Sequence, residues 1–143
     1  MVTIGHERQG LKLLLVVACA LVDADNRVLI AQRPKGKQLA DMWEFPGGKI
    51  NAGERPEHAL IRELDEELGI AVKEACLAPL TFASHSYGSF HLLMPLYVCR
   101  RWEGFVVPRE AQALKWVRAK DLRQFAMPPA DSPLISPLIE LLG

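Results

Sequence analysis

Between Gly48 and Ile70 the chain reads GKINAGERPEHALIRELDEELGI, and the inference of its fold starts from this segment. Pro56 suits the first position of a helix and Gly69 suits the position just past its end, so the segment predicts a helix over 56–68. At about 100° per residue, its apolar side chains fall on one stripe, which is typical of a helix that packs on a core. The stripe comprises Leu60, Ile61, Leu64 and Leu68.

A second stripe of the predicted helix is acidic, because Glu63, Glu66 and Glu67 are spaced at i, i+3 and i+4. Carboxylates at this spacing repel one another, and the C-terminal half of a helix disfavours anions. A bound divalent cation would reverse both penalties, and ligands that are all oxygen favour Mg²⁺ or its substitute Mn²⁺. The residues alone leave two alternatives open, a metal site and a solvated acidic face.

Glycines precede this helix at Gly47, Gly48 and Gly53, and they let the backbone approach a ligand closely. The carbonyl of Gly47 is a candidate for completing a metal shell. Arg62 precedes Glu66 by four residues, so it could orient the carboxylates or form an ordinary helix salt bridge.

Size and composition indicate one domain over residues 1–143, since the chain is half hydrophobic. Lys+Arg and Asp+Glu each total 17, and this balance argues against a stable nucleic-acid partner. The three cysteines show neither a disulfide framework nor a zinc-site spacing, which fits the cytoplasm.

Leu13 to Val22 is an apolar run that could be an export signal or a buried strand. We expect a strand and no membrane association, because the run is too short to span a bilayer. The turn-type residues 23–27 and the apolar residues 28–31 follow, so the pattern predicts a β-hairpin.

The remaining segments alternate between strand and helix patterns and predict an α+β sandwich. We expect strands over 11–22, 28–33, 75–84, 90–101 and 114–117, a Pro/Gly-rich stretch over 34–53, a short helix near 119–121 and a last helix over 132–142.

The fixed positions of residues 48–70 match the Nudix box, G-x5-E-x7-R-E-U-x-E-E-x-G-U with U aliphatic, at every specified position. The chain therefore resembles the Nudix hydrolases. The resemblance implies the Nudix fold, a mixed β-sheet sandwiched between helices (α/β/α), and hydrolysis of a nucleoside diphosphate linked to another group.

The resemblance also implies roles for individual residues. Glu63, Glu66 and Glu67 would bind Mg²⁺, with the Gly47 carbonyl as a further ligand. Glu54 and Arg62 would support the helix and its loop. Glu63 is the first candidate for the general base, and Glu110 is a second candidate for metal binding or base catalysis.

Segments outside the box resemble the MutT-like branch of the family over roughly residues 12–140. The matching segments are Gln32-Arg33-Pro34, Trp43–Ile50, Arg101–Gly104, Glu110-Ala111-Gln112, Trp116 and Met127–Asp131. This resemblance implies hydrolysis of a small-molecule nucleoside triphosphate, mainly 8-oxo-dGTP, to the monophosphate and pyrophosphate. The residues expected at the nucleotide are Arg33, Phe45, Gly48, Lys49, Phe90 and Asp131.

Several alternatives remain open. MutT-like proteins have Asn at the position of Asp131 and a positive residue at that of Phe90, whereas a branch that cleaves CTP and modified cytosine nucleotides carries Ala-Asp there. Asp131 could instead cap a helix, and Phe45 and Phe90 could be core residues. A non-catalytic nucleotide-binding Nudix module is the alternative of another class. A monomer and a homodimer both fit the sequence.

Overall fold

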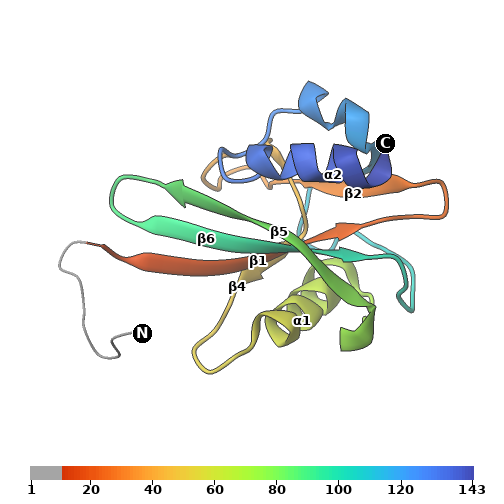
Figure 1. Ribbon diagram of the computed structural model, residues 1–143, viewed down its shortest axis with the longest axis horizontal. Helices are drawn as coiled ribbons and strands as arrows, with labels where there is room; N and C mark the ends of the chain where they lie inside the picture. Colours follow the sequence, from red (N-terminus) through yellow and green to blue (C-terminus); the bar gives the residue numbers. More distant parts are fainter. Residues whose placement is uncertain (1–10) are drawn as a thin grey trace.

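A computed structural model describes residues 11–143 of the protein (Figure 1). Two β-sheets form its centre. The first is mixed, with the strand order β4-β1-β6-β5, and the second is antiparallel, with the order β3-β2-β7. The strands are β1 (Leu13–Leu21), β2 (Arg27–Gln32), β3 (Trp43–Glu44), β4 (Gly47–Lys49), β5 (Leu77–Ser86), β6 (His91–Cys99) and β7 (Leu114–Arg118).

Strand β1 lies inside the first sheet, between β4 and β6. The apolar run from Leu13 to Val22 therefore contains a strand, as expected, and is not described by the export-signal alternative. Val17, Cys19 and Leu21 face one core, while Ala18 and Ala20 face the other. Burial on both faces explains why residues 17–21 include no polar side chain, whereas Leu13 and Leu15 in the first half of the strand are exposed.

The predicted β-hairpin over 11–33 is wrong. β1 and β2 join different sheets, and a single isolated bridge between Val22 and Val28 connects their ends. Residues 24–26 do form a turn, but this turn directs the chain from one sheet to the other. Sequence patterns show where a strand ends and do not show which strand it pairs with.

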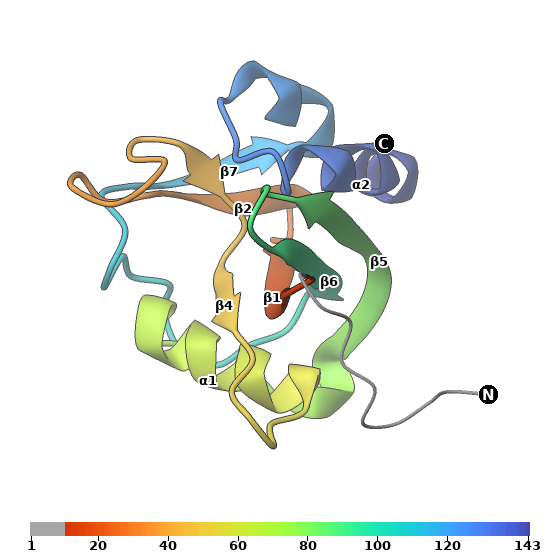
Figure 2. The ribbon, with the colours of Figure 1, turned by 90° about the vertical axis from the view of Figure 1, so that its left-hand side faces the viewer.

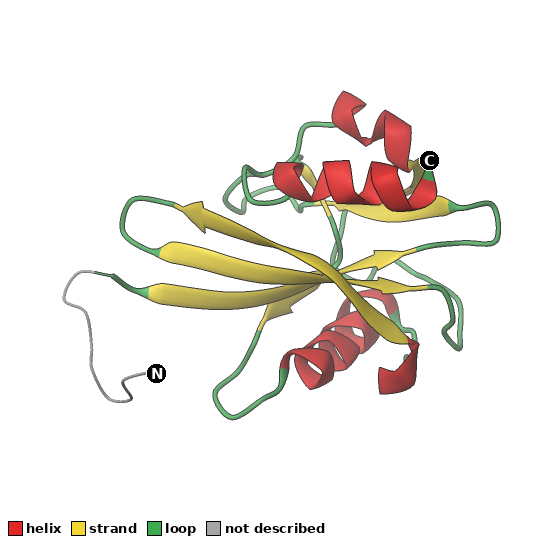
Figure 3. Ribbon diagram, in the orientation of Figure 1, coloured by secondary structure: helices red, strands yellow, loops and turns green. Residues whose placement is uncertain are grey.

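Helices cover the two outer sides (Figures 1 and 3). Helix α1 (Pro56–Leu68) packs on the four-stranded sheet through Leu60, Leu64 and Leu68. The 3₁₀ turns η2 (Ala119–Gln124) and η3 (Ser132–Leu134) and the helix α2 (Ile135–Leu142) lie on the opposite side and cover the core that includes Leu134 and Leu138. The third 3₁₀ turn, η1 (Glu74–Cys76), leads into β5.

Most predicted boundaries agree within a few residues, and α1 agrees at both ends. Gly69 follows α1 with φ 71°, the left-handed conformation expected of a glycine at this position. The predicted last helix is divided into η3 and α2, and the stretch 34–53 contains the unpredicted short strands β3 and β4. Within residues 11–143, no helix is long and apolar enough to cross a membrane.

Candidate active site

A cleft of about 1530 Å³ opens where β1, β4, α1 and the β5–β6 turn meet. Figure 2 shows β4 running from the sheet toward the loop that leads into α1. Most of the predicted site residues line this cleft, namely Arg33, Phe45, Gly47, Gly48, Lys49, Glu63, Glu67, Phe90, Glu110 and Asp131. Three predicted residues, Glu54, Arg62 and Glu66, are not part of its lining.

The two glycines of β4 are required by space on opposite sides of that strand. A Cβ on Gly47 would collide with the Val17 carbonyl oxygen and lie 2.8 Å from the Ala18 Cα, so Gly47 presses against the central strand. A Cβ on Gly48 would lie 2.5 Å from Oε2 and 2.6 Å from Oε1 of Glu63. The missing side chain of Gly48 therefore provides the space that the Glu63 carboxylate occupies.

We expect Gly48→Ala to lower kcat by about 10²-fold, because the added methyl group displaces the Glu63 carboxylate by about 1 Å. The backbone of Gly48 has no positive φ, so the alanine itself causes little strain. Steady-state kinetics together with a thermal melt test this expectation. A variant with wild-type kcat would show that the position of Glu63 does not limit turnover.

Glu63, Glu67 and Glu110 form a cluster of like charges in the cleft. Burial, together with the charges of Glu63 and Glu110, raises the pKa of Glu67 to about 8, although the Gly47 N–H donates a 3.0 Å hydrogen bond to its Oε2. Burial also raises the pKa of Glu63 against the opposing effect of Arg62. A carboxylate cluster with this unrelieved repulsion fits a divalent cation.

The carboxylates of Glu63, Glu67 and Glu110, which line the cleft, are oxygen donors of the kind that a hard cation prefers. Within residues 11–143, no three His, Cys, Asp or Glu side chains are arranged closely enough to hold a metal ion on their own. Mg²⁺ is usually held by one or two carboxylates together with waters and substrate phosphates, so a smaller protein ligand set is compatible with it.

Glu66 differs from the other two box carboxylates. Its side chain is 51% exposed and contacts Arg62 Nη1 at 3.5 Å. The structure therefore brings Glu63 and Glu67 together in the cleft and leaves Glu66 at its outer edge.

Arg62 links the box helix to the loop before it. Its guanidinium donates to Glu54 through Nε (2.9 Å) and Nη2 (2.9 Å), to the Lys49 carbonyl (3.1 Å) and to Glu63 Oε1 (2.8 Å). These bonds hold the pKa of Glu54 down at about 2 and raise that of Arg62. The supporting role predicted for Glu54 and Arg62 thus has a defined geometry, in which Arg62 orients Glu63.

The other end of the cleft is built around Asp131, which is 6% exposed. Its Oδ2 accepts a 3.1 Å hydrogen bond from the Phe45 backbone N–H, 86 residues away. Burial and the nearby charge of Glu44 raise the pKa of Asp131 to about 7. Asp131 is the N-cap residue of η3, but its carboxylate makes no capping bond and is directed to the Phe45 N–H instead.

Arg33 and Glu44 form an ion pair beside Asp131, with Nη1 at 2.9 Å from Oε1. Phe45 is a core residue with 3% exposure that also borders the cleft. Phe90 is half-buried and stacks on Tyr87, with ring centroids 5.3 Å apart. Phe45 thus combines the core position and the cleft position, whereas Phe90 lines the cleft and belongs to neither hydrophobic core.

Two residues at this end were not assigned a role from the sequence. Glu44 stands beside the quoted Phe45, but its charge acts on Asp131 only because residues 44 and 131 converge in space. The Tyr87 hydroxyl accepts a 3.2 Å hydrogen bond from the Ala130 N–H, so it supports the loop that carries Asp131. Tyr87 and Ala130 are 43 residues apart, so no local sequence pattern predicts their contact.

The chain matches the family described as NUDIX domain over residues 17–136. It is 32% identical over 131 residues to the 8-oxo-dGTP diphosphatase of Escherichia coli K12, which covers 92% of this chain and all of that protein. It is 36% identical over 133 residues to the CTP pyrophosphohydrolase of the same organism, covering 92% of this chain and 95% of that protein. The solution structure of the E. coli ORF135 protein superposes with a TM-score of 0.82 at 30% identity and covers 95% of each chain.

The carboxylate cluster, the complete box and these matches together define the class of protein. The chain belongs to the Nudix hydrolase family, whose members generally use a divalent metal ion. It is a hydrolase that acts on acid anhydrides, within the part of the family concerned with nucleotide-pool sanitation.

Proposed function

We propose that the protein is a Mg²⁺-dependent nucleoside triphosphate pyrophosphohydrolase that converts 8-oxo-dGTP to the monophosphate and pyrophosphate. One observation carries the proposal. A single cleft is lined by the carboxylates Glu63, Glu67 and Glu110 and also by the buried Asp131. This arrangement fits a substrate with a phosphate chain and a base, and relatives with matching activity cover nearly the whole chain.

The residues at the carboxylate end account for the hydrolysis. Glu63, Glu67 and the Gly47 carbonyl would hold Mg²⁺, with Glu66 at the outer edge of the site. When bound, Mg²⁺ neutralises phosphate charge and lowers the pKa of a coordinated water. Glu63 is our candidate for accepting the proton as water attacks the β-phosphorus, and Glu110 is the second candidate.

Positive side chains at the cleft would receive the phosphate chain. Lys49 is exposed on the strand that carries the two glycines, and it borders the cleft next to Gly48. Arg33 also borders the cleft, but its guanidinium is already bound to Glu44 and to the Gln38 carbonyl. We therefore assign the phosphates chiefly to Lys49 and place Arg33 toward the base.

A cytosine nucleotide is the second candidate substrate, and Asp131 is the observation that favours it. An ionised carboxylate only accepts hydrogen bonds, so it suits the amino group of cytosine. A protonated carboxyl also donates, so it can serve both the carbonyl and the N7–H of 8-oxoguanine. The CTP pyrophosphohydrolase relative supports this alternative.

A substrate panel tests the proposal directly. Purified protein with Mg²⁺ is incubated with 8-oxo-dGTP, dGTP, CTP, 5-methyl-dCTP, ADP-ribose and diadenosine tetraphosphate, and the products are separated by ion-exchange chromatography. We expect kcat/KM for 8-oxo-dGTP to exceed that for dGTP by at least about tenfold, because the site discriminates through buried hydrogen-bonding groups. The absence of a preference for any nucleoside triphosphate would contradict the proposal, and a preference for CTP would favour the second candidate.

A further inference from the structure

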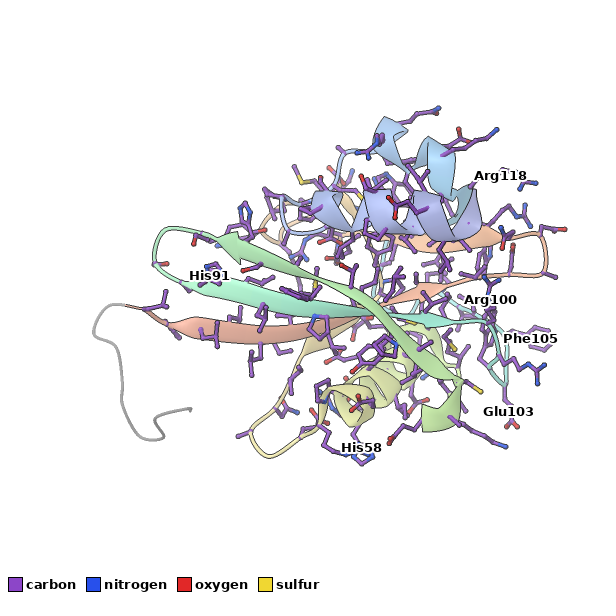
Figure 4. All side chains as sticks on the ribbon, in the orientation of Figure 1. His58, His91, Arg100, Glu103, Phe105 and Arg118 are labelled. Atoms are coloured by element: carbon purple, nitrogen blue, oxygen red, sulfur yellow. The ribbon has the colours of Figure 1, made fainter. Side chains whose placement is uncertain are left out.

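The loop between β6 and β7 is attached to the C-terminal end of α1. Residues Ala71 and Glu103 exchange backbone hydrogen bonds of 3.0 and 2.9 Å, and the Val107 N–H donates to the Leu68 carbonyl at 3.0 Å. The last carbonyls of a helix have no partner within the helix, so an outside donor is needed there. Figure 4 labels Glu103 and Phe105 on this loop, near the end of α1.

Arg109 binds α1 through both its backbone and its side chain. Its backbone N–H donates to the Glu67 carbonyl at 3.0 Å, and its Nη1 donates to the Asp65 carbonyl at 3.1 Å. A cation at the C-terminal end of a helix is also favoured by the helix dipole. Arg109 thus binds the same turn of α1 that presents the Glu67 carboxylate to the cleft.

Gly69 provides the space for this contact. A Cβ at position 69 would lie 2.9 Å from Nη2 and 3.0 Å from Cζ of Arg109, so any larger residue would press on the guanidinium. The glycine that ends the box therefore has two functions here. It adopts the positive φ of 71° that ends the helix, and its missing side chain leaves space for the guanidinium of Arg109.

The residue after Arg109 is Glu110, which borders the cleft together with Glu63 and Glu67. Glu110 is exposed on a loop, and like charges in the cleft repel it. The neighbouring attachment to α1 opposes this repulsion. Arg109 itself is outside the cleft lining, so it can act on the reaction only through groups whose positions it fixes, and Glu110 is its immediate neighbour in the chain.

We propose that Arg109 is a positioning residue that fixes Glu110 against the box carboxylates by binding the carbonyls at the end of α1. This inference rests on the proposed hydrolase function for its kinetic consequence. In this proposal the contact between Gly69 and Arg109 contributes to turnover, in addition to the role of Gly69 in ending the helix.

A double-mutant cycle of Arg109→Ala and Glu110→Gln tests the proposal. We expect Arg109→Ala to lower kcat for the preferred nucleoside triphosphate by about tenfold with KM changed less than about twofold, because a catalytic group becomes misplaced. In the Glu110→Gln background, the same substitution should change kcat by less than about twofold. Equal losses in both backgrounds, or wild-type kcat in either single variant, would overturn the proposal.

Two further variants separate positioning from folding. Arg109→Lys keeps the charge but replaces the planar guanidinium, so we expect it to restore part of the kcat lost in Arg109→Ala. Arg123→Ala is the control, because it also removes one positive charge. Arg123 belongs to η2, which lies on the side of the molecule opposite α1 (Figure 1), and its guanidinium donates to Ser136 Oγ at 2.7 Å. We expect this variant to retain wild-type kcat. If Arg109→Ala does not fold, Arg109→Lys provides the test. Wild-type kcat in Arg109→Lys, together with unchanged amide hydrogen exchange at residues 107–113, would then overturn the proposal.

Amide hydrogen exchange gives a readout that does not depend on turnover. We expect Arg109→Ala to raise exchange at residues 107–113 by about tenfold, while α1 stays protected, because this local opening needs only the loss of the loop contacts. A wild-type protein that hydrolyses no nucleotide contradicts the proposed function and leaves the exchange experiment valid. Unchanged exchange in Arg109→Ala would overturn the attachment itself.

Discussion

Glu67→Gln is expected to lower kcat by about 10³-fold or more while the fold is retained. Glu67 borders the cleft, and its carboxylate is the one held by the Gly47 N–H. Loss of a negative ligand weakens charge stabilisation worth several kcal/mol in the transition state, which corresponds to this factor. Single-turnover kinetics at saturating Mg²⁺ measure the loss.

The same substitution should stabilise the metal-free protein at high pH. The folded-state pKa of Glu67, about 8, lies above the ordinary value of 4.5, so between these values the folded state binds more protons than the unfolded state. Stability therefore falls as pH rises from about 4.5 to 8, and glutamine removes this loss. Thermal melts in a chelator should show a higher Tm for Glu67→Gln at pH 9 and little difference at pH 4.

Asp65→Asn is the matched control, because Asp65 is an exposed carboxylate on the same helix outside the cleft lining. We expect wild-type kcat and no comparable pH-dependent gain in Tm. If Glu67→Gln retained wild-type turnover, or unfolded at every pH, the carboxylate would be structural and its assignment as a metal ligand would be wrong.

Asp131→Asn is expected to change which base the enzyme prefers and to remove the pH dependence of that preference. In the wild type, burial raises the pKa of Asp131 to about 7. Below this pH the carboxyl can donate as well as accept, and above it the carboxylate only accepts. We expect the ratio of kcat/KM for 8-oxo-dGTP to that for CTP to fall by about tenfold or more between pH 6 and 8.5.

Competition between the two substrates in one reaction measures this ratio. Effects of pH on the metal ion and on the hydrolytic step cancel, because both substrates share them. Asparagine cannot ionise, so the variant should show a ratio that is high and constant over the same pH range. A variant ratio that still follows the wild-type curve would assign the pH dependence to a group other than Asp131.

The sequence predicted the local parts of this structure well. Helix α1 is confirmed at Pro56 and at Leu68, because a proline, a glycine and one apolar stripe determine its ends and its buried face. The box spacing also predicted that Glu63 and Glu67 would share a site, since i and i+4 lie on one side of any helix. At about 100° per residue, Glu66 lies on the opposite side of Glu63 from Glu67, so the spacing places it at one edge of the acidic stripe but does not show which edge faces the cleft.

The parts that could not be predicted depend on long-range contacts. The partners of β1 are β4 and β6 rather than β2, and this choice depends on the whole sheet rather than on the turn at residues 23–27. The Asp131–Phe45 hydrogen bond joins positions 86 residues apart. Arg109 belongs to no motif recognised in the sequence. Its proposed role follows only from the position of its guanidinium next to Gly69 in the structure.

The two ends of the cleft are built from separate stretches of chain. The carboxylates come from α1 and the loop at 110, whereas Asp131 belongs to the segment that leads into η3 and α2 on the other side of the sheets. If the proposed roles hold, base choice and bond cleavage depend on different segments of the chain. We then expect substitutions in residues 127–131 to change the preferred nucleobase while the carboxylates of α1 stay in place, which would offer a route both for evolutionary divergence and for engineering.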